Sequence, residues 1–142
     1  MRFLITLAFI LIVGSKDFPL DNQPSEFKVE YVKEKIKQLK FEHPDLILRQ
    51  VMLESGYLTS GLARGYNNVT GMKFPKSRGT TAIGETESGF AVYSSIGSCL
   101  ADLKIHQMRY LRGLSRAEYL DKLNKLYAGE TNYSKKLLGI SF

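Results

Sequence analysis

The feature that most constrains the fold is a glycine-rich stretch, residues 65–90, set between segments with helical periodicity. Two pieces that favour β-structure, residues 80–83 and 90–93, lie in or directly after it. Together they predict a small, irregular lobe of two or three strands with turns at the glycines. Because helices are predicted on both sides of this lobe, we expect an α+β fold that is mainly α, with a cleft between the helical part and the lobe.

Before the glycine-rich stretch, apolar residues recur at helical spacing in two segments. The first begins near Glu26, with Ser25 as a suitable N-cap. The second follows Pro44, which suits the first position of a helix, and ends at Glu54 before Gly56. A short helical turn capped by Thr59 or Ser60 comes next. The apolar stripes are Val29, Val32, Ile36 and Leu39 in the first helix, and Leu46, Ile47 and Val51 in the second.

Three more helices are predicted after the lobe. Ser94 or Ser95 is placed to cap a long helix that continues to about residue 111. Ser115 and Glu118 form the Ser-x-x-Glu pattern of a capping box, which predicts another helix ending at Gly129. A last short helix is expected over residues 133–138, capped by Asn132. We expect Ile96, Leu100, Leu103 and Tyr110 to face inward from the long helix, and the next helix carries Leu120, Leu123 and Leu126.

The length of 142 residues is enough for one domain with its own core. Residues 1–15 contain an early arginine and a mostly apolar run, which is typical of a secretory signal peptide and short for a membrane span. A retained, membrane-inserted N-terminal anchor is the alternative. Residues 16–25 are predicted to be a linker and residues 26–142 the domain. We therefore expect an exported protein, in the periplasm, the cell envelope or outside the cell.

The chain carries a formal net charge of +6, which suits an acidic polymer or an anionic envelope surface as a partner. Its Lys and Arg residues are scattered and not interleaved with aromatic residues, so no nucleic-acid partner is expected. Cys99 is the single cysteine, which excludes an intramolecular disulfide, and among apolar neighbours it is expected to be a small core residue. No His, Cys and Asp cluster has metal-ligand spacing, so neither a metal nor another cofactor is expected.

Glu54 is the residue best placed for acid chemistry. It falls in the last turn of a predicted helix, where the negative end of the helix dipole and unpaired carbonyls disfavour a carboxylate. That field and apolar neighbours both raise a carboxyl pKa. A glutamic acid that keeps its proton near neutral pH can protonate a leaving oxygen as a general acid. A solvated surface glutamate is the alternative interpretation.

A series of ordered motifs belongs to a pattern that spans about residues 29–140, nearly the whole predicted domain. They are MLESGY at residues 52–57, SGLA at 60–63, NNVTGMK at 67–73, GFAVYSS at 89–95 and YAGETNYSKK at 127–136. In this order and at these separations they resemble the bacterial and phage β-N-acetylglucosaminidases of the flagellar-muramidase-like and autolysin type, which cleave peptidoglycan. The resemblance implies a lysozyme-like helical domain, with a small β-lobe flanking a glycan cleft.

The resemblance also implies roles for individual residues. Glu54 is expected to be the general acid that protonates the glycosidic oxygen between N-acetylglucosamine and N-acetylmuramic acid. Tyr127 matches a catalytic-site tyrosine near the reacting sugar, with a buried core tyrosine as the alternative. Of the pair Asn67 and Asn68, expected to bind substrate, one supports the loop and the other faces the cleft. Two turn-forming residues without sugar contact are the alternative.

A second catalytic carboxylate is expected in the β-lobe, where Glu85 is favoured over Glu87. A carboxylate across a gap wide enough for water would give inversion, whereas a closer pair would form a covalent intermediate. If neither glutamate reaches the site, the 2-acetamido oxygen of the substrate attacks the anomeric carbon, and a polar group such as Tyr127 steadies the developing charge.

The chain departs from the family pattern in its aromatic residues. It contains no tryptophan, and Tyr57 stands where the family has one. Sugar stacking is therefore expected from other aromatic residues, with Tyr57 and Tyr93 as predicted substrate-binding residues. The expected partner is a peptidoglycan glycan strand, bound by a monomer. A muramidase or lytic transglycosylase of the same fold, and a glycan-binding or assembly module without activity, are the alternative functions.

Overall fold

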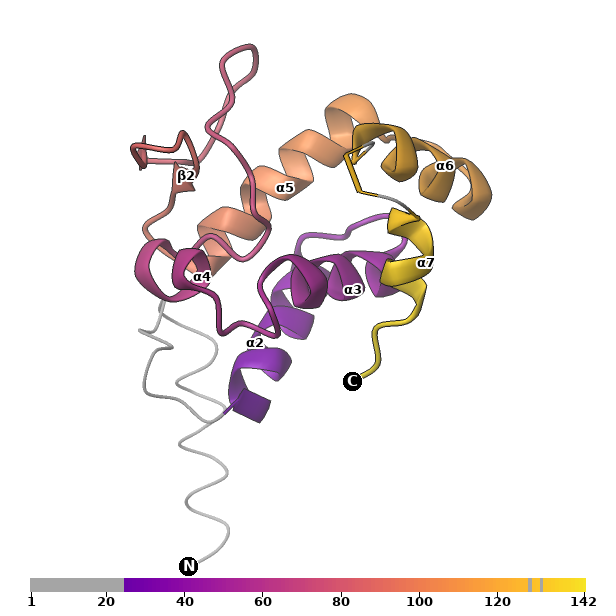
Figure 1. Ribbon diagram of the computed structural model, residues 1–142, viewed down its shortest axis with the longest axis horizontal. Coiled ribbons are helices and arrows are strands. Elements are labelled where there is room, and N and C mark those ends of the chain that lie inside the picture. Colours follow the sequence, from indigo (N-terminus) through magenta and orange to yellow (C-terminus); the bar gives the residue numbers. More distant parts are fainter. Residues whose placement is uncertain (1–24, 128, 131) are drawn as a thin grey trace, which may run out of the picture.

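The computed structural model describes residues 25–127, 129–130 and 132–142. The predicted leader, residues 1–15, and all but the last residue of the predicted linker lie outside the described residues. Figure 1 shows a mainly helical domain with a small two-stranded sheet, which confirms the predicted fold class. The elements are α2 (Ser25–Gln38), α3 (Pro44–Glu54), α4 (Gly61–Tyr66), β1 (Gly84–Glu85), β2 (Ala91–Val92), α5 (Ile96–Tyr110), α6 (Arg116–Leu126) and α7 (Tyr133–Leu138).

The described part of the chain holds no helix with the length and hydropathy needed to cross a bilayer.

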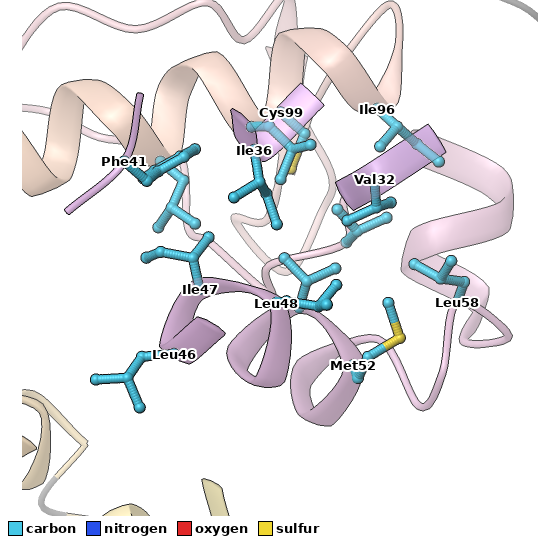
Figure 2. Close-up of a cluster of buried hydrophobic side chains, with 14 of the residues drawn as sticks. Val32, Ile36, Phe41, Leu46, Ile47, Leu48, Met52, Leu58, Ile96 and Cys99 are labelled. Carbon is cyan, nitrogen blue, oxygen red and sulfur yellow. The ribbon is translucent and has the colours of Figure 1, made fainter. Parts of the chain in front are cut away.

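The helix α3 lies at the centre of the domain and packs against both α2 and α7 (Figure 1). Figure 2 shows Ile47, Leu48 and Met52 pointing from α3 toward side chains of α2 and α5, whereas Leu46 points away from them. All four are buried, and each buried side chain of this size contributes about 1.5–3 kcal/mol. Because α3 is buried on more than one face, the end of this helix is held in a fixed position.

In the last two turns of α5, the residues that are buried differ from those predicted. Ile96, Leu100 and Leu103 are buried as expected, and Cys99 lies among them. Tyr110 was expected inside but is 41% exposed, so that prediction is wrong. The buried residue in its place is Gln107, whose side-chain amide bonds both the N–H and the carbonyl of Glu42, each at 2.9 Å. A polar side chain completes the inner face, and hydrophobic periodicity does not detect it.

Three of the predicted helix caps are confirmed. The Ser60 hydroxyl accepts the Ala63 N–H at 3.1 Å at the start of α4. The Ser95 hydroxyl accepts the Ser98 N–H at 3.0 Å at the start of α5. At the start of α6, Ser115 and Glu118 exchange the two hydrogen bonds of a capping box. Asn132 precedes α7, but its side chain makes no capping hydrogen bond. The helix expected to continue toward residue 129 ends at Leu126, which is 47% exposed.

The sheet of the β-lobe is shorter than predicted and begins later. β1 and β2 are antiparallel, with Gly84 opposite Val92 and Glu85 opposite Ala91. Residues 80–83 were expected to be a strand but bond mainly to other groups. The Thr81 hydroxyl donates to the Ser98 carbonyl of α5 at 2.6 Å, and the Thr80 hydroxyl accepts the Ala82 N–H at 3.1 Å. These side-chain bonds compete with the strand ladder and fasten the segment to α5.

A buried ion pair holds the lobe against α5. Arg78 Nη1 lies 2.6 Å from Asp102 Oδ1, and the Tyr93 hydroxyl donates to Asp102 Oδ2 at 2.6 Å. Burial alone would raise the pKa of Asp102, but hydrogen bonds from Arg78 and Tyr93 outweigh it and hold that pKa below its ordinary value. Both charged side chains are almost fully buried, so each depends on the other for compensation.

We predict that Asp102→Asn lowers the free energy of unfolding by about 3–5 kcal/mol, because it leaves the Arg78 charge buried without its partner. Urea denaturation at neutral pH measures this loss. The matched control is Asp121→Asn, which removes an exposed partner of Lys125 and should cost less than about 1 kcal/mol. Equal losses in the two variants would contradict this role for Asp102. In the wild type, the contribution of Asp102 should fade as the pH falls through its depressed pKa.

Candidate active site

The turn after α3 fixes the direction of the Glu54 side chain. Ser55, fully buried, donates its hydroxyl to the Val51 carbonyl at 2.5 Å and accepts the Leu58 N–H at 2.9 Å. Gly56, Tyr57 and Leu58 all have positive φ values, of 55°, 56° and 68°. Non-glycine residues adopt this conformation only when the surrounding structure compensates its cost. The buried Ser55 hydroxyl supplies that compensation and ends the helix directly after Glu54.

A tyrosine from the far end of the chain completes the environment of Glu54. The Tyr133 hydroxyl, on the first residue of α7, donates to Glu54 Oε1 at 2.7 Å. The ring of Tyr127 stacks on that of Tyr133, with centroids 4.1 Å apart and planes within 4°. Gln50, one turn before Glu54 on the same face of α3, donates its amide to the Tyr127 hydroxyl at 3.0 Å. Tyr133 thus holds the Glu54 carboxyl, and Tyr127, which Gln50 bonds, stacks on Tyr133.

These neighbours set the protonation of the site. Burial raises the pKa of Glu54, the hydrogen bond from Tyr133 opposes this effect, and the negative charge of Glu130 adds to it, so that the net pKa is raised. Burial also raises the pKa values of Tyr127 and Tyr133, so both hydroxyls stay protonated at neutral pH. The sequence predicted a raised pKa from the helix end and apolar neighbours, and burial is the main cause in the structure.

Gly71 lies against the second oxygen of the Glu54 carboxyl. A Cβ at this position would lie 3.4 Å from Glu54 Oε2, and Gly71 has a φ of 65°. A Cβ would make only an ordinary van der Waals contact there, so it is the backbone conformation that favours glycine. Within the described residues, the hydrogen bond of the Glu54 side chain involves Oε1. Oε2 is consequently the oxygen that can hold a proton for transfer to a bound molecule.

Asn67 and Asn68 hold the loop that carries Gly71. Asn68 is 1% exposed and donates its amide to the carbonyls of Met72 at 3.0 Å and Ala91 at 2.9 Å. Asn67, in the left-handed conformation that ends α4, donates to the Tyr93 carbonyl at 3.0 Å. Both amides thus bind the backbone of the protein, whereas the sequence led us to expect this of only one of the pair. Contact of either residue with a sugar stays a prediction.

The remaining predicted site residues lie apart from this centre. Glu85 is an exposed residue of β1, and no described contact joins it to Glu54. Tyr93 is buried, and its hydroxyl is used by Asp102. Tyr57 is 48% exposed and directs its hydroxyl to the Ser141 carbonyl at 3.4 Å. The structure therefore brings Glu54 and Tyr127 together through Tyr133, and the described contacts of Glu85, Tyr93 and Tyr57 are with other groups.

Sequence reasoning missed the closest partner of the acid. Tyr133 is the second tyrosine of the YAGETNYSKK motif, but nothing in the spacing shows that it reaches a carboxylate 79 residues earlier. Gln50 was missed because a polar residue within an apolar stripe gives no periodic signal. Among the described residues, no group of three or more His, Cys, Asp and Glu side chains is arranged to hold a metal ion.

Solved structures share this fold. One, from a type VI secretion system effector-immunity complex of Pseudomonas protegens, has a TM-score of 0.62 and 21% identity over 84% of this chain and 89% of that chain. Another, the catalytic domain of the autolysin Auto from Listeria monocytogenes, has a TM-score of 0.59 and 18% identity over 95% of this chain and 90% of that one. At these identities the likeness concerns the fold.

The comparison with curated proteins found no match. The family comparison did: residues 29–141 match the glucosaminidase family, described as mannosyl-glycoprotein endo-beta-N-acetylglucosaminidase. The match includes α3, the β-lobe and all of α7, which together carry Glu54, Gly71 and Tyr133. With its mainly helical fold and small antiparallel sheet, the chain belongs to the glucosaminidase family.

Proposed function

We propose that this protein hydrolyses peptidoglycan by cleaving the β-1,4 bond between N-acetylglucosamine and N-acetylmuramic acid, outside the cytoplasm. The observation that carries the proposal is a half-buried glutamic acid of raised pKa, held by Tyr133 at the end of α3 in a chain of the glucosaminidase family. The autolysin with the same fold supports the cell wall as the site of action. The basic surface suits an anionic envelope.

In this mechanism Glu54 acts as the general acid. Its Oε2 donates a proton to the glycosidic oxygen as the bond from that oxygen to the anomeric carbon of N-acetylglucosamine breaks. The positive charge that develops on the sugar ring favours the ionised form of Glu54 that the transfer leaves behind. The Tyr133 hydroxyl bonds that carboxylate at Oε1, so the donor becomes a better proton source without losing its orientation.

Two routes supply the nucleophile, and each makes a different demand on the chain. In the first, Glu85 takes a proton from a water molecule, which attacks the anomeric carbon and inverts it. In the second, the 2-acetamido oxygen of the sugar attacks, and water then opens the resulting ring with retention. The second route needs one protein acid, and the stacked pair Tyr127 and Tyr133 supplies the polar group beside it. The anomer released by wild type, and the activity of Glu85→Gln, separate the two routes.

We predict that Glu54→Gln abolishes cleavage of purified peptidoglycan, lowering the rate by at least about a thousandfold because the general acid is lost. Borohydride reduction followed by mass spectrometry of the fragments identifies the ends formed by the wild type. Reducing N-acetylglucosamine ends, absent with the variant, are the expected result. Reducing or anhydro N-acetylmuramic acid ends would assign the other linkage. Wall binding without fragments from either protein would contradict the enzymatic function.

We predict that Tyr133→Phe moves the alkaline limb of the pH–rate profile to higher pH. The variant keeps the ring that buries Glu54 but loses the hydrogen bond that lowers its pKa. We also expect kcat to fall about tenfold, since the acid loses the partner that orients it. The control is Tyr119→Phe, a buried tyrosine whose hydroxyl contacts Gln107 instead. An alkaline limb unchanged by Tyr133→Phe would argue against coupling between Tyr133 and Glu54.

We predict that Glu54→Gln raises the Tm of the protein at pH 8. The folded state prefers protonated Glu54, so this contribution to stability is complete below the ordinary glutamate pKa and is lost as the pH rises through the raised folded pKa. Glutamine is neutral throughout and avoids the loss. Differential scanning calorimetry should therefore show a gain at pH 8 that shrinks toward pH 3.5. The exposed Glu87→Gln serves as the control, and a pH-independent difference for Glu54→Gln would contradict a raised pKa.

A further inference from the structure

Arg49 joins the central helix to the last ten residues of the described chain. From α3, its Nη1 donates to the carbonyl of Leu138 at 3.0 Å and to that of Ile140. Leu138 is the last residue of α7, where carbonyls lack helical partners and the helix dipole favours a cation. The Nε of Arg49 is buried and has no hydrogen-bond partner in the described part of the chain. Nη1 of the guanidinium is therefore bound to the end of α7.

Other contacts hold the same segment, which we call the C-terminal strap and define as residues 133–142. Phe142 lies beneath two cations, 5.6 Å from the Arg49 guanidinium and 6.0 Å from Lys33 Nζ. The Tyr57 hydroxyl donates to the Ser141 carbonyl at 3.4 Å. The strap thus lies along α3 from near residue 49 to the turn after Glu54. Both aromatic and polar contacts attach its end to the core.

The strap does not hold its own shape. With six residues, α7 is far shorter than a helix that is stable alone in water. Tyr133 and Leu137 are fully buried, and they bury only if α7 stays on α3. Asn124 of α6 fixes the start of α7 by exchanging two hydrogen bonds with Ser134, at 3.0 and 2.9 Å. Arg49 performs the corresponding task at the other end of α7.

We propose that Arg49 is a positioning residue that holds the C-terminal strap over α3 and thereby keeps Glu54 buried and bonded to Tyr133. The proposal rests on the proposed function, because it assigns to Arg49 the maintenance of the acid that function requires. Arg49 acts through the strap and does not touch the reacting atoms. Nη1 alone donates to both carbonyls, from a planar guanidinium that reaches further than the ammonium of a lysine.

Loss of Arg49 and loss of the Tyr133 hydroxyl have opposite effects on the acid. Tyr133→Phe keeps the strap in place, so Glu54 stays buried and its pKa rises. Arg49→Met releases the end of the strap and admits water to Glu54. Because burial is the largest cause of the raised pKa, its loss moves the pKa down toward the ordinary glutamate value. The two variants therefore distinguish a contact with the acid from a hold on the strap.

The experiment is a carboxyl carbon NMR titration of the full chain labelled at glutamate, with the Glu54 signal assigned from its absence in Glu54→Gln. Arg49→Met is expected to lower the pKa of Glu54, and Arg49→Lys to lower it less. Arg112→Met, which removes an exposed arginine on the α5–α6 connection, controls for the lost charge. A Glu54 pKa that is unchanged or raised in Arg49→Met overturns the proposal. Arg49→Lys provides the same decision if the methionine variant does not fold.

Hydrolysis assays on the same variants complete the test. We expect Arg49→Met to lower kcat about tenfold with little change in KM, and to move the alkaline limb of the profile to lower pH. A rise in KM alone would assign Arg49 to substrate binding and overturn the positioning role. The titration does not depend on activity. A wild type that cleaves no glycan therefore refutes the proposed function, while the titration still decides the role of Arg49.

Discussion

The hydrogen bond from Tyr133 to Glu54 Oε1 joins segments 79 residues apart, and much of the domain is arranged so that it can form. One partner stands at the end of a helix buried by α2, α5 and α7, which fixes its position. The other stands on a helix of six residues that persists only through its contacts with α3 and α6. Burial of α3 in the core thus fixes Glu54 Oε1, and the C-terminal strap fixes the Tyr133 hydroxyl that bonds it.

Opposing effects act on the pKa of the Glu54 carboxyl. Burial and the charge of Glu130 favour the protonated form, whereas Tyr133 favours the ionised one. A dry site alone would hold the proton too tightly for transfer, and a hydrogen bond alone would release it before substrate arrives. The proposed role of Glu54 as general acid needs both effects together, and its ionisation in the folded state costs stability.

The two oxygens of Glu54 belong to different parts of the fold. Oε1 is bonded by the strap, while Oε2 lies 3.4 Å from where a Cβ of Gly71 would be. Asn68 holds the loop of Gly71 by hydrogen bonds to the Met72 and Ala91 carbonyls. Asp102 of α5 binds the β-lobe through Tyr93. Among the described contacts neither Asn68 nor Asp102 touches Glu54, but Asn68 fixes the backbone that lies against Oε2.

The sequence by itself determined the features that depend on neighbours within about one helical turn: the caps at Ser95 and Ser115, the inward stripe of α3, and Glu54 at its end before Gly56. Only the tertiary structure decided the rest. Gln107 in place of Tyr110, the strand at Gly84–Glu85 instead of residues 80–83, and Tyr133 as partner of the acid all result from polar side chains that bond distant backbone or carboxyl groups. Such bonds have no period along the chain, so hydrophobic patterns and local propensities contain no record of them.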